Sequence, residues 1–378
     1  MPQFNIADFD PAMATKPANT DGIVWRLPFE KPFSLLGFNW FDVDHAYERL
    51  PIKGRPTTIT QYANGGTVTI PAEKCGAINL SRDTAGGQIR FRTDSSQFLL
   101  QGELFSPYGM DHMAFTGSAG FDIYLKVDGV WKCFGVTRTD HSVTTFATTI
   151  VSGLKREMRD VIINFPLYNA VLSLSVGLDE NAIVEAPTPF KDPRPVVFYG
   201  TSITQGGCAT RPGMASSNIL SRLLERYVLN LGFSGSGKGE PEIIQMLADI
   251  ENPAAYLIDH AWNNAYAEFA QSLPIIIDAL REKHPDTPIV LISPTPGRGD
   301  FDYYEVKNTR GAQQTELLKA ETERRIAAGD KNITFFDAFH DSLGDDYWEG
   351  LVDGCHMTDL GFYRFAKAIL PHLQKILG

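Results

Sequence analysis

Two segments of the chain hold residue types that could carry out nucleophilic attack and proton transfer. Ser202 stands in the glycine-rich stretch GTSITQGG over residues 200–207, and Asp353 precedes His356 by three positions. A carboxylate at this spacing can fold back onto the imidazole Nδ1, which leaves Nε2 to accept a serine proton. The pattern therefore predicts a nucleophile, a base and an orienting acid. Structural alternatives are a helix-capping serine and a surface Asp and His near a helix start.

Two further segments offer groups that could stabilise a developing negative charge. Residues 232–237 read GFSGSG, and the exposed backbone N–H groups of such a loop, Gly235 among them, can point into a cleft. Residues 259–264 read DHAWNN, in which a side-chain amide can donate to an oxyanion. The glycines could equally form a flexible loop, and the asparagine could cap the next helix. Either Asn263 or Asn264 could supply this amide.

The second half of the chain alternates short apolar runs with stretches of helical spacing. Five runs have the composition of strands buried on both faces: residues 196–199, 228–231, 256–259, 289–293 and 333–337. Helical spacing follows them at residues 219–227, 240–250, 266–283, 313–328 and 360–376. This order predicts an α/β fold with a doubly wound, five-stranded parallel sheet. In such a sheet ligands sit beyond the carboxyl ends of the strands, where the segments described above lie.

The first half of the chain differs in composition and in hydrophobic periodicity. Short segments rich in Thr, Val, Ile and Phe are separated by turn residues, and long helical periodicity is absent. Examples are residues 67–70, 89–93, 98–100, 121–127 and 171–176. We expect an all-β sandwich or jelly-roll domain at residues 1–185, a proline-containing linker at 186–194 and the α/β domain at 195–378.

Composition argues against several classes of protein. The 378 residues carry a formal net charge of −11, which disfavours nucleic acid and anionic membrane surfaces as partners. No apolar run approaches the roughly 18 residues that span a bilayer. None of the four cysteines forms a CxxC or zinc-like spacing, so we expect reduced thiols and no metal. A pairing of Cys208 with Cys355 is the less favoured alternative.

The start of the chain bears on its compartment. The segment MPQFNIADFD has neither a basic start nor an apolar stretch, so no secretory signal is visible. The sequence as it stands predicts a cytoplasmic protein. A secreted or periplasmic protein would require a signal that had been removed.

Taken together, the Ser, Gly, Asn and Asp/His segments resemble the four blocks of the SGNH hydrolases, which include the GDSL-type esterases. The resemblance implies a flavodoxin-like sheet in which Ser202 is the nucleophile, His356 the general base and Asp353 the residue that orients it. It also implies an oxyanion hole made of the Ser202 and Gly235 backbone N–H groups and the Asn263 side-chain amide. No cofactor is implied.

The resemblance covers the chain from about Trp25 to the C-terminus. The stretches YGTSITQGGCATRPGM, NLGFSGSGKGEPE and DGCHMTDLGF are similar to a bacterial subgroup of GDSL-type hydrolases with an N-terminal β domain. That domain is named for a GxDLY motif, which here reads GFDIY at residues 120–124. Thr201 replaces the Asp of GDSL, and Asn264 stands where many relatives have the Asp of GxND.

These features predict a serine esterase that acts through an acyl-enzyme. The resemblance, and the absence of a lid-like apolar segment, favour small acyl esters, with O-acetyl groups on carbohydrates as the expected substrate. The alternatives are a longer-chain lipase or thioesterase, and a glycan-binding protein whose hydrolase domain is vestigial. The small ester or acetylated carbohydrate is the expected partner, and a homo-oligomer is left open.

Three further residues are candidates for substrate contact. Arg211 follows the serine loop and could bind a carboxylate or hydroxyl group, with a structural ion pair as the alternative. His112 and Met113 end a segment, residues 107–113, with the composition of a protruding recognition loop. Our hypothesis is that this loop reaches over the Ser202 site. In the alternative, it packs against the linker and holds the two domains together.

Overall fold

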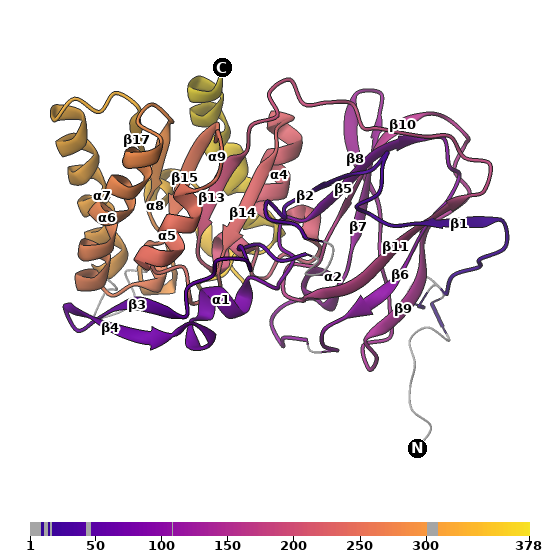
Figure 1. Ribbon diagram of the computed structural model, residues 1–378, viewed down its shortest axis with the longest axis horizontal. Helices are drawn as coiled ribbons and strands as arrows, with labels where there is room; N and C mark the ends of the chain where they lie inside the picture. The colour runs from indigo at the N-terminus through magenta and orange to yellow at the C-terminus, as the bar shows by residue number, and fades with distance from the viewer. Residues whose placement is uncertain (1–8, 11–13, 16, 43–46, 108, 301–308) are drawn as a thin grey trace.

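The computed structural model describes residues 9–10, 14–15, 17–42, 47–107, 109–300 and 309–378. Figure 1 shows two parts side by side, a strand-rich part at one end and a helix-covered sheet at the other. We call them the β half (residues up to 185) and the α/β half (residues 196–378). Strand β12 (Val184–Glu185) ends the first and strand β13 (Val196–Gly200) begins the second. The residues between them, where the sequence places the linker, form neither helix nor strand.

The β half is a sandwich of two antiparallel sheets, as predicted. The sheets have the orders β1-β11-β6-β9 and β12-β5-β10-β7-β8, with β2 beside β5. Alternate residues of β11, Leu174, Val176 and Leu178, belong to the core between them, as the two-residue period of a strand requires. The strands are β1 (Ile23–Arg26), β2 (Ser34–Leu36), β5 (Gln88–Thr93), β6 (Phe98–Leu104), β7 (Asp122–Val127), β8 (Val130–Val136), β9 (Thr145–Val151), β10 (Arg159–Asn164) and β11 (Val171–Asp179).

The α/β half contains the predicted five-stranded parallel sheet, in the order β14-β13-β15-β16-β17. Besides β13, its strands are β14 (Val228–Gly232), β15 (Ala255–Asp259), β16 (Ile289–Ile292) and β17 (Ile333–Phe336). The first four along the sheet are buried over their whole length, because helices cover both faces. The chain passes from β13 to β14 on one side, and then crosses to β15 on the other side of β13. A crevice therefore opens at the carboxyl end of β13, which is the switch point of this topology.

Helices cover the two faces of the sheet in separate groups. On one face, α4 (Ser216–Leu224) packs beside α9 (Asp359–Leu377). On the other, α5 (Pro241–Ala248), α6 (Tyr266–Lys283) and α7 (Thr309–Ala327) form a layer. The shorter helices are α2 (Phe115–Ser118), α3 (Ser202–Gln205), α8 (Ala338–Asp341), η4 (Ala72–Lys74), η5 (Pro212–Met214), η6 (Ala261–Asn263), η7 (Arg298–Asp300) and η8 (Tyr347–Gly350). Within the described part of the chain, no helix combines the length and apolar character needed to cross a membrane.

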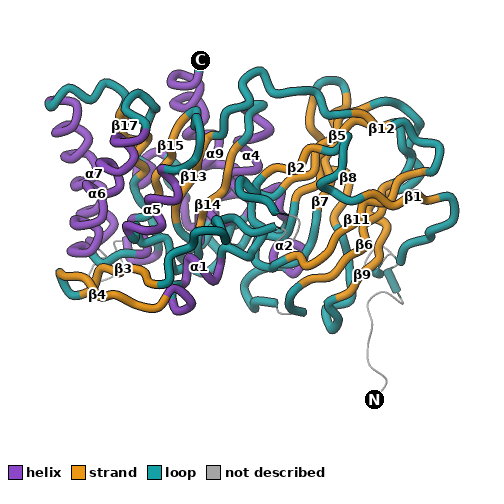
Figure 2. Tube along the Cα trace, in the orientation of Figure 1, coloured by secondary structure: helices purple, strands orange, loops and turns teal. Residues whose placement is uncertain are grey.

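One segment of the first half of the chain packs on the α/β half instead of joining the sandwich. Strands β3 (Thr58–Ala63) and β4 (Gly66–Pro71) form a separate hairpin, followed by α1 (Gly76–Leu80). Figure 2 shows this hairpin alongside the helices of the α/β half. Ile59 lies in the same core as α5 and α6, and the Glu242 carboxylate accepts hydrogen bonds from Thr60 N and Oγ1 at 2.9 and 2.8 Å. The strand expected at residues 67–70 therefore belongs to a hairpin that connects the first half of the chain to the α/β half.

Candidate active site

The end of the central strand β13 places Ser202 at the crevice. A Cβ at Gly200 would lie 2.4 Å from the Asp259 carbonyl oxygen, so a side chain there would clash with the neighbouring strand. Thr201 then caps helix α3, and its Oγ1 accepts a hydrogen bond from Ile203 N at 3.3 Å. Ser202 is the first residue of that helix and is 7% exposed. Its hydroxyl thus lies at the carboxyl end of the strand, where the sheet leaves room for a ligand.

Ser202, His356 and Asp353 form one chain of hydrogen bonds. Ser202 Oγ lies 2.9 Å from His356 Nε2, and His356 Nδ1 lies 2.7 Å from Asp353 Oδ2. The other carboxylate oxygen accepts the backbone N–H groups of His356 and Cys355 at 2.7 and 2.9 Å. Burial raises the pKa of Asp353, but these hydrogen bonds outweigh it and hold the pKa at about 2. The acid is therefore ionised, and it fixes the tautomer in which Nε2 faces the serine.

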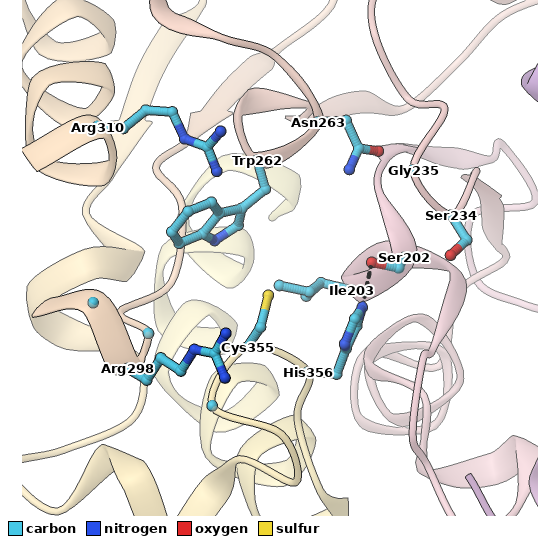
Figure 3. Close-up of a pocket in the computed structure, with 13 residues that line it drawn as sticks. Ser202, Ile203, Ser234, Gly235, Trp262, Asn263, Arg298, Arg310, Cys355 and His356 are labelled. Carbon is cyan, nitrogen blue, oxygen red and sulfur yellow. Dashed lines mark hydrogen bonds between the residues drawn. The ribbon is translucent and has the colours of Figure 1, made fainter. Parts of the chain in front are cut away.

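Two groups capable of binding an oxyanion flank the serine. Gly235 has a left-handed backbone (φ +64°), and its position on the cavity wall leaves open space around it. Asn263, at the end of η6, accepts a hydrogen bond from Gly237 N at its Oδ1, at 3.1 Å. With the oxygen held in this way, the amide NH₂ points towards Ser202 (Figure 3). Asn263 therefore presents an amide donor towards Ser202, and Gly235 lies on the wall of the same cavity.

The adjacent asparagine has a different environment. Asn264 is buried, and its side-chain NH₂ donates to the His260 carbonyl oxygen at 2.8 Å. Its own carbonyl oxygen accepts a hydrogen bond from Gln314 Nε2 at 3.0 Å. Asn263 lines the cavity, whereas Asn264 ties η6 to α7.

A cavity of about 490 Å³ adjoins the serine. The predicted residues on its wall are Ser202, Gly235, Asn263 and His356. The wall also contains residues to which the sequence reasoning gave no role: Trp262, Arg298, Arg310 and Cys355 (Figure 3). Arg298 follows β16, so inspection of what lies beyond that strand would have found it. Arg310 carries no such signal, because it belongs to the start of a long helix.

Two family models match the chain. Residues 193–374 match the GDSL-like lipase/acylhydrolase family, and residues 23–184 match the GxDLY domain, the N-terminus of SGNH-hydrolase-type esterases. The chain belongs to the GDSL-like hydrolases of the SGNH class. A comparison with curated proteins finds no match.

Solved structures share this two-part fold. A protein from Bacteroides ovatus described as a GDSL-like lipase is 29% identical, with a TM-score of 0.81. The salicylyl-acyltransferase SsfX3 from a tetracycline biosynthetic pathway is 18% identical (TM-score 0.69), and a family two carbohydrate esterase from Cellvibrio japonicus is 12% identical (TM-score 0.57). Each match covers 94% of this chain and 98% of the other. At these identities, the last two show the fold alone.

In this GDSL-type hydrolase, the β half holds the loops that form the site. Gln205 of α3 donates to Asp83 Oδ2 at 3.0 Å, and its Oε1 accepts the backbone N–H of Ser234 at 2.8 Å. Arg49 is completely buried and donates to the carbonyl oxygens of Gly232 and Leu80 at 2.7 and 2.8 Å. Because Gly232 and Ser234 lead into Gly235, these contacts fix the loop that carries the Gly235 N–H. No motif in the sequence pointed to them.

The GxDLY motif lies at the interface between the halves. The buried Asp122 carboxylate accepts hydrogen bonds from Arg211 Nη1 at 2.9 Å, Gly213 N at 2.8 Å and Asn164 Nδ2 at 2.7 Å. The guanidinium of Arg211 also lies over the Tyr124 ring, and its central carbon is 5.3 Å from the ring centroid. Arg211 is thus held in the structural ion pair that was the alternative to substrate binding. Its side chain helps to join the two halves.

His112 and Met113 occupy different places although they are adjacent. His112 Nε2 lies 3.9 Å from Asp353 Oδ2, and its ring meets the His356 ring edge to face at 5.8 Å. Met113 is buried in the core of the α/β half. Residue 108 of this loop lies outside the described residues. The loop thus places the exposed imidazole of His112 beside Asp353 and His356. The buried side chain of Met113 holds the loop against the α/β half.

The cysteines near the site are free thiols, as are the other two. Burial, and then the nearby Asp353 carboxylate, raise the pKa of Cys208 to about 12. The ligand atoms of His112, Cys208 and His356 lie within 4.8 Å of one another, so they could approach a common metal ion. Both ring nitrogens of His356 are, however, engaged by Ser202 and Asp353, and a metal ion would compete with those hydrogen bonds.

Proposed function

We propose that this protein is a serine esterase that removes small acyl groups, with O-acetyl groups on carbohydrates as its substrate. The observation that carries the proposal is the 2.9 Å contact between Ser202 Oγ and His356 Nε2 on the wall of the cavity. Asn263 and Gly235, which could supply oxyanion donors, line the same cavity. A hydroxyl, a base and oxyanion donors at one point are the requirements of acyl transfer.

The mechanism follows from these positions. His356 Nε2 takes the Ser202 proton as Oγ attacks the ester carbonyl, and the Ser202 and Gly235 N–H groups and the Asn263 amide stabilise the oxyanion. The imidazolium, stabilised by Asp353, then gives its proton to the leaving alcohol, and an acyl-enzyme remains. Water, activated by the same base, attacks the acyl-enzyme and releases the acid.

The cavity wall and the relatives of the fold guide the choice of substrate. The indole of Trp262 lies on the cavity wall with its Nε1 bonded to Thr295 O at 3.2 Å, so a flat apolar face is held in place beside the site. Aromatic faces suit the apolar face of a sugar ring. One relative of the same fold is named as a carbohydrate esterase, which is why we choose an acetylated sugar over a lipid ester.

A labelling and activity experiment tests the proposal. A fluorophosphonate probe should label Ser202, and Ser202→Ala should lose turnover of 4-nitrophenyl acetate by a factor on the order of 10⁶ in kcat. Rates along a series of 4-nitrophenyl esters should fall as the acyl chain lengthens, and acetylated glycans should be deacetylated. Labelling at Ser234 in place of Ser202 would refute the nucleophile. A preference for long chains would favour a lipase or thioesterase, and glycan binding without turnover would favour a binding protein.

A further inference from the structure

Three side chains that can bind a metal ion lie together at the catalytic base. His112, Cys208 and His356 each offer one nitrogen or sulfur atom, and these three atoms lie within 4.8 Å of one another. The ligand atoms around a tetrahedral zinc ion are about 3.5 Å apart, because its bonds to nitrogen and sulfur are roughly 2.0–2.3 Å long. The group could therefore close around an ion with movements of about 1 Å. The His112 side chain is exposed, so it has room for such a movement.

The three residues come from separate segments that are already tied together. His112 stands in the loop before α2, and Thr116 Oγ1 of that helix donates to the Thr210 carbonyl oxygen at 2.6 Å. Thr210 N donates to Asp359 Oδ1 at 2.8 Å, so the loop that carries Cys208 is also bound to the start of α9. The catalytic base lies just before that helix. These contacts organise the group in advance, which lowers the cost of binding an ion.

Cys208 has a backbone conformation that suits another residue better. Its φ is +80°, in the left-handed region where glycine is the usual residue. Strained residues of this kind cluster at functional sites. The thiol is protonated at rest because burial raises its pKa, but a metal ion deprotonates a thiol that coordinates it. Cys208 thus has the chemistry of a metal ligand at a position where a cysteine is otherwise unfavourable.

The types of ligand select the class of ion. Two imidazole nitrogens and one sulfur suit zinc, whereas calcium and magnesium prefer oxygen ligands. Three protein ligands leave the fourth position of a tetrahedral zinc site to water. Water can reach the group on the side of the exposed His112.

The presence of the base in this group decides what a bound ion would do. His356 Nε2 contacts Ser202 Oγ at 2.9 Å, and Nδ1 contacts Asp353 Oδ2 at 2.7 Å. An ion on Nε2 would occupy the atom that takes the serine proton. An ion on Nδ1 would displace Asp353, and the orientation of the ring would be lost. In both cases the base is disabled, so such an ion would be an inhibitor and not a cofactor.

We propose that His112, Cys208 and His356 bind a zinc-type divalent cation, and that this ion reversibly switches the enzyme off. Binding depends on the three side chains alone, whereas the loss of activity rests on the proposed esterase function. The ion would join the β half to the serine and base loops. It should therefore stabilise the folded protein while it inhibits, and its removal should restore the contact between Ser202 and His356.

Zinc titrations of the wild type and matched variants test the proposal. We would measure 4-nitrophenyl acetate hydrolysis against zinc chloride, with each rate relative to the same protein without metal, and then add EDTA. Zinc should inhibit the wild type, EDTA should restore its activity, and magnesium chloride should have no effect. In Cys208→Ser and His112→Ala the zinc concentration that halves the rate should rise by about tenfold or more, because even a residue that only orients a ligand can be worth about tenfold in metal affinity.

Cys355→Ser and His340→Ala are the controls. Cys355 offers a thiol on the cavity wall next to the base (Figure 3), and His340 is an exposed histidine paired with Asp337 at 3.0 Å. Neither belongs to the group of three, so both variants should keep the sensitivity of the wild type to zinc. Because His112 is exposed, His112→Ala tests the site even if Cys208→Ser fails to fold.

Cobalt(II) gives a measurement that does not need turnover. A cobalt ion bound by a thiolate absorbs in the near ultraviolet. This band should appear on titration of the wild type and of Cys355→Ser, and it should be absent from Cys208→Ser. Melting temperatures with and without zinc should show stabilisation in the same two proteins.

Several results would overturn the proposal. Equal zinc inhibition in all variants would do so, as would loss of sensitivity in Cys355→Ser in place of Cys208→Ser. Activity that EDTA removes and zinc restores would also contradict it, because the ion would then assist the reaction. Hydrolysis that zinc leaves unchanged would refute the switch and leave the esterase function standing. If the wild type hydrolyses no ester but shows a cobalt–thiolate band that Cys208→Ser removes, the metal site stands and the proposed function fails.

Discussion

The two halves of the molecule support the site in different ways. In the α/β half, Asp353 holds His356 from three residues away. In the β half, Arg49 reaches Gly232 across 183 residues, and Asp122 reaches Arg211 across 89. Contacts within the α/β half, including that of Ser202 with His356, place the groups that face the cavity. Contacts from the β half place the loops that carry them. Changes in the first set should therefore lower activity, and changes in the second should lower stability.

The sharpest test of this division is the pair Asn263 and Asn264. Asn263→Ala should lower kcat by roughly 10²–10³ with little change in KM or in melting temperature, because one oxyanion donor is lost. Asn264→Ala should lower the melting temperature, because the buried His260 carbonyl loses its donor. Steady-state kinetics and thermal unfolding of both variants decide the matter. If Asn264→Ala shows the loss in kcat and Asn263→Ala does not, the donor is the second asparagine.

The ion pair of the GxDLY motif should behave in the opposite way. Asp122→Ala leaves the Arg211 cation without its carboxylate at the interface, which should cost about 3 kcal/mol and lower the melting temperature by several degrees. Adding Arg211→Met should recover part of the loss, since the unpaired charge is then removed. The exposed pair of Arg92 and Glu185 provides the control, and Glu185→Gln should change the melting temperature little. Equal losses from Asp122→Ala and Glu185→Gln would contradict a structural role for the motif.

A buried acid in the α/β half predicts how stability depends on pH. Burial raises the pKa of Asp259 to about 7, only partly offset by a hydrogen bond from Thr204 Oγ1 at 2.8 Å. The folded protein therefore binds this proton more tightly than the unfolded chain, and stability falls as the pH rises from about 4 through 7. Asp259→Asn should raise the melting temperature at pH 8 by a few degrees relative to the wild type, and much less at pH 5.

Thermal unfolding at these two pH values, with the exposed Asp128→Asn as control, measures this effect. Two other acids, the buried Glu240 and the partly buried Asp83, have pKa values raised by desolvation to about 7 and about 6, so some pH dependence should remain in the variant. If the variant and the wild type have the same melting temperature at both pH values, ionisation of Asp259 does not destabilise the folded protein.

The smallest expected effect tests His112, a residue of the β half that approaches the hydrogen-bonded acid and base. His112→Ala should change kcat/KM a few-fold, and differently for a small and a bulky ester, with the melting temperature nearly unchanged, because the side chain is exposed. The adjacent Met113→Ala should instead lower the melting temperature, because it empties a core position. Equal losses on both esters, together with a lowered melting temperature for His112→Ala, would make the loop purely structural.

The reach of these contacts also explains what the sequence could and could not reveal. The parallel sheet was predictable because strands buried on both faces read as apolar runs, and Ser202, Asp353 and His356 stand in segments whose chemistry is local. The pairing of Arg49 with Gly232, or of Gln205 with Asp83, depends on how two distant segments fold together, so no local pattern records it. The packing of the β3–β4 hairpin on the α/β half could not be predicted for the same reason. Its strand pattern does not indicate which surface it packs against.

The burial of Arg49 bears on how this protein can change over generations. Its guanidinium binds carbonyl oxygens from the β half and from the end of β14, so neither half is complete without the other. A gene rearrangement that cut the chain at the linker would leave Gly232 without its donor and strip the hairpin from α5 and α6. We therefore expect the two segments, which match separate family models, to remain together in one chain. New specificities should arise by substitution on the cavity wall, at residues such as Trp262, where the contacts of Arg49 and Glu242 are kept.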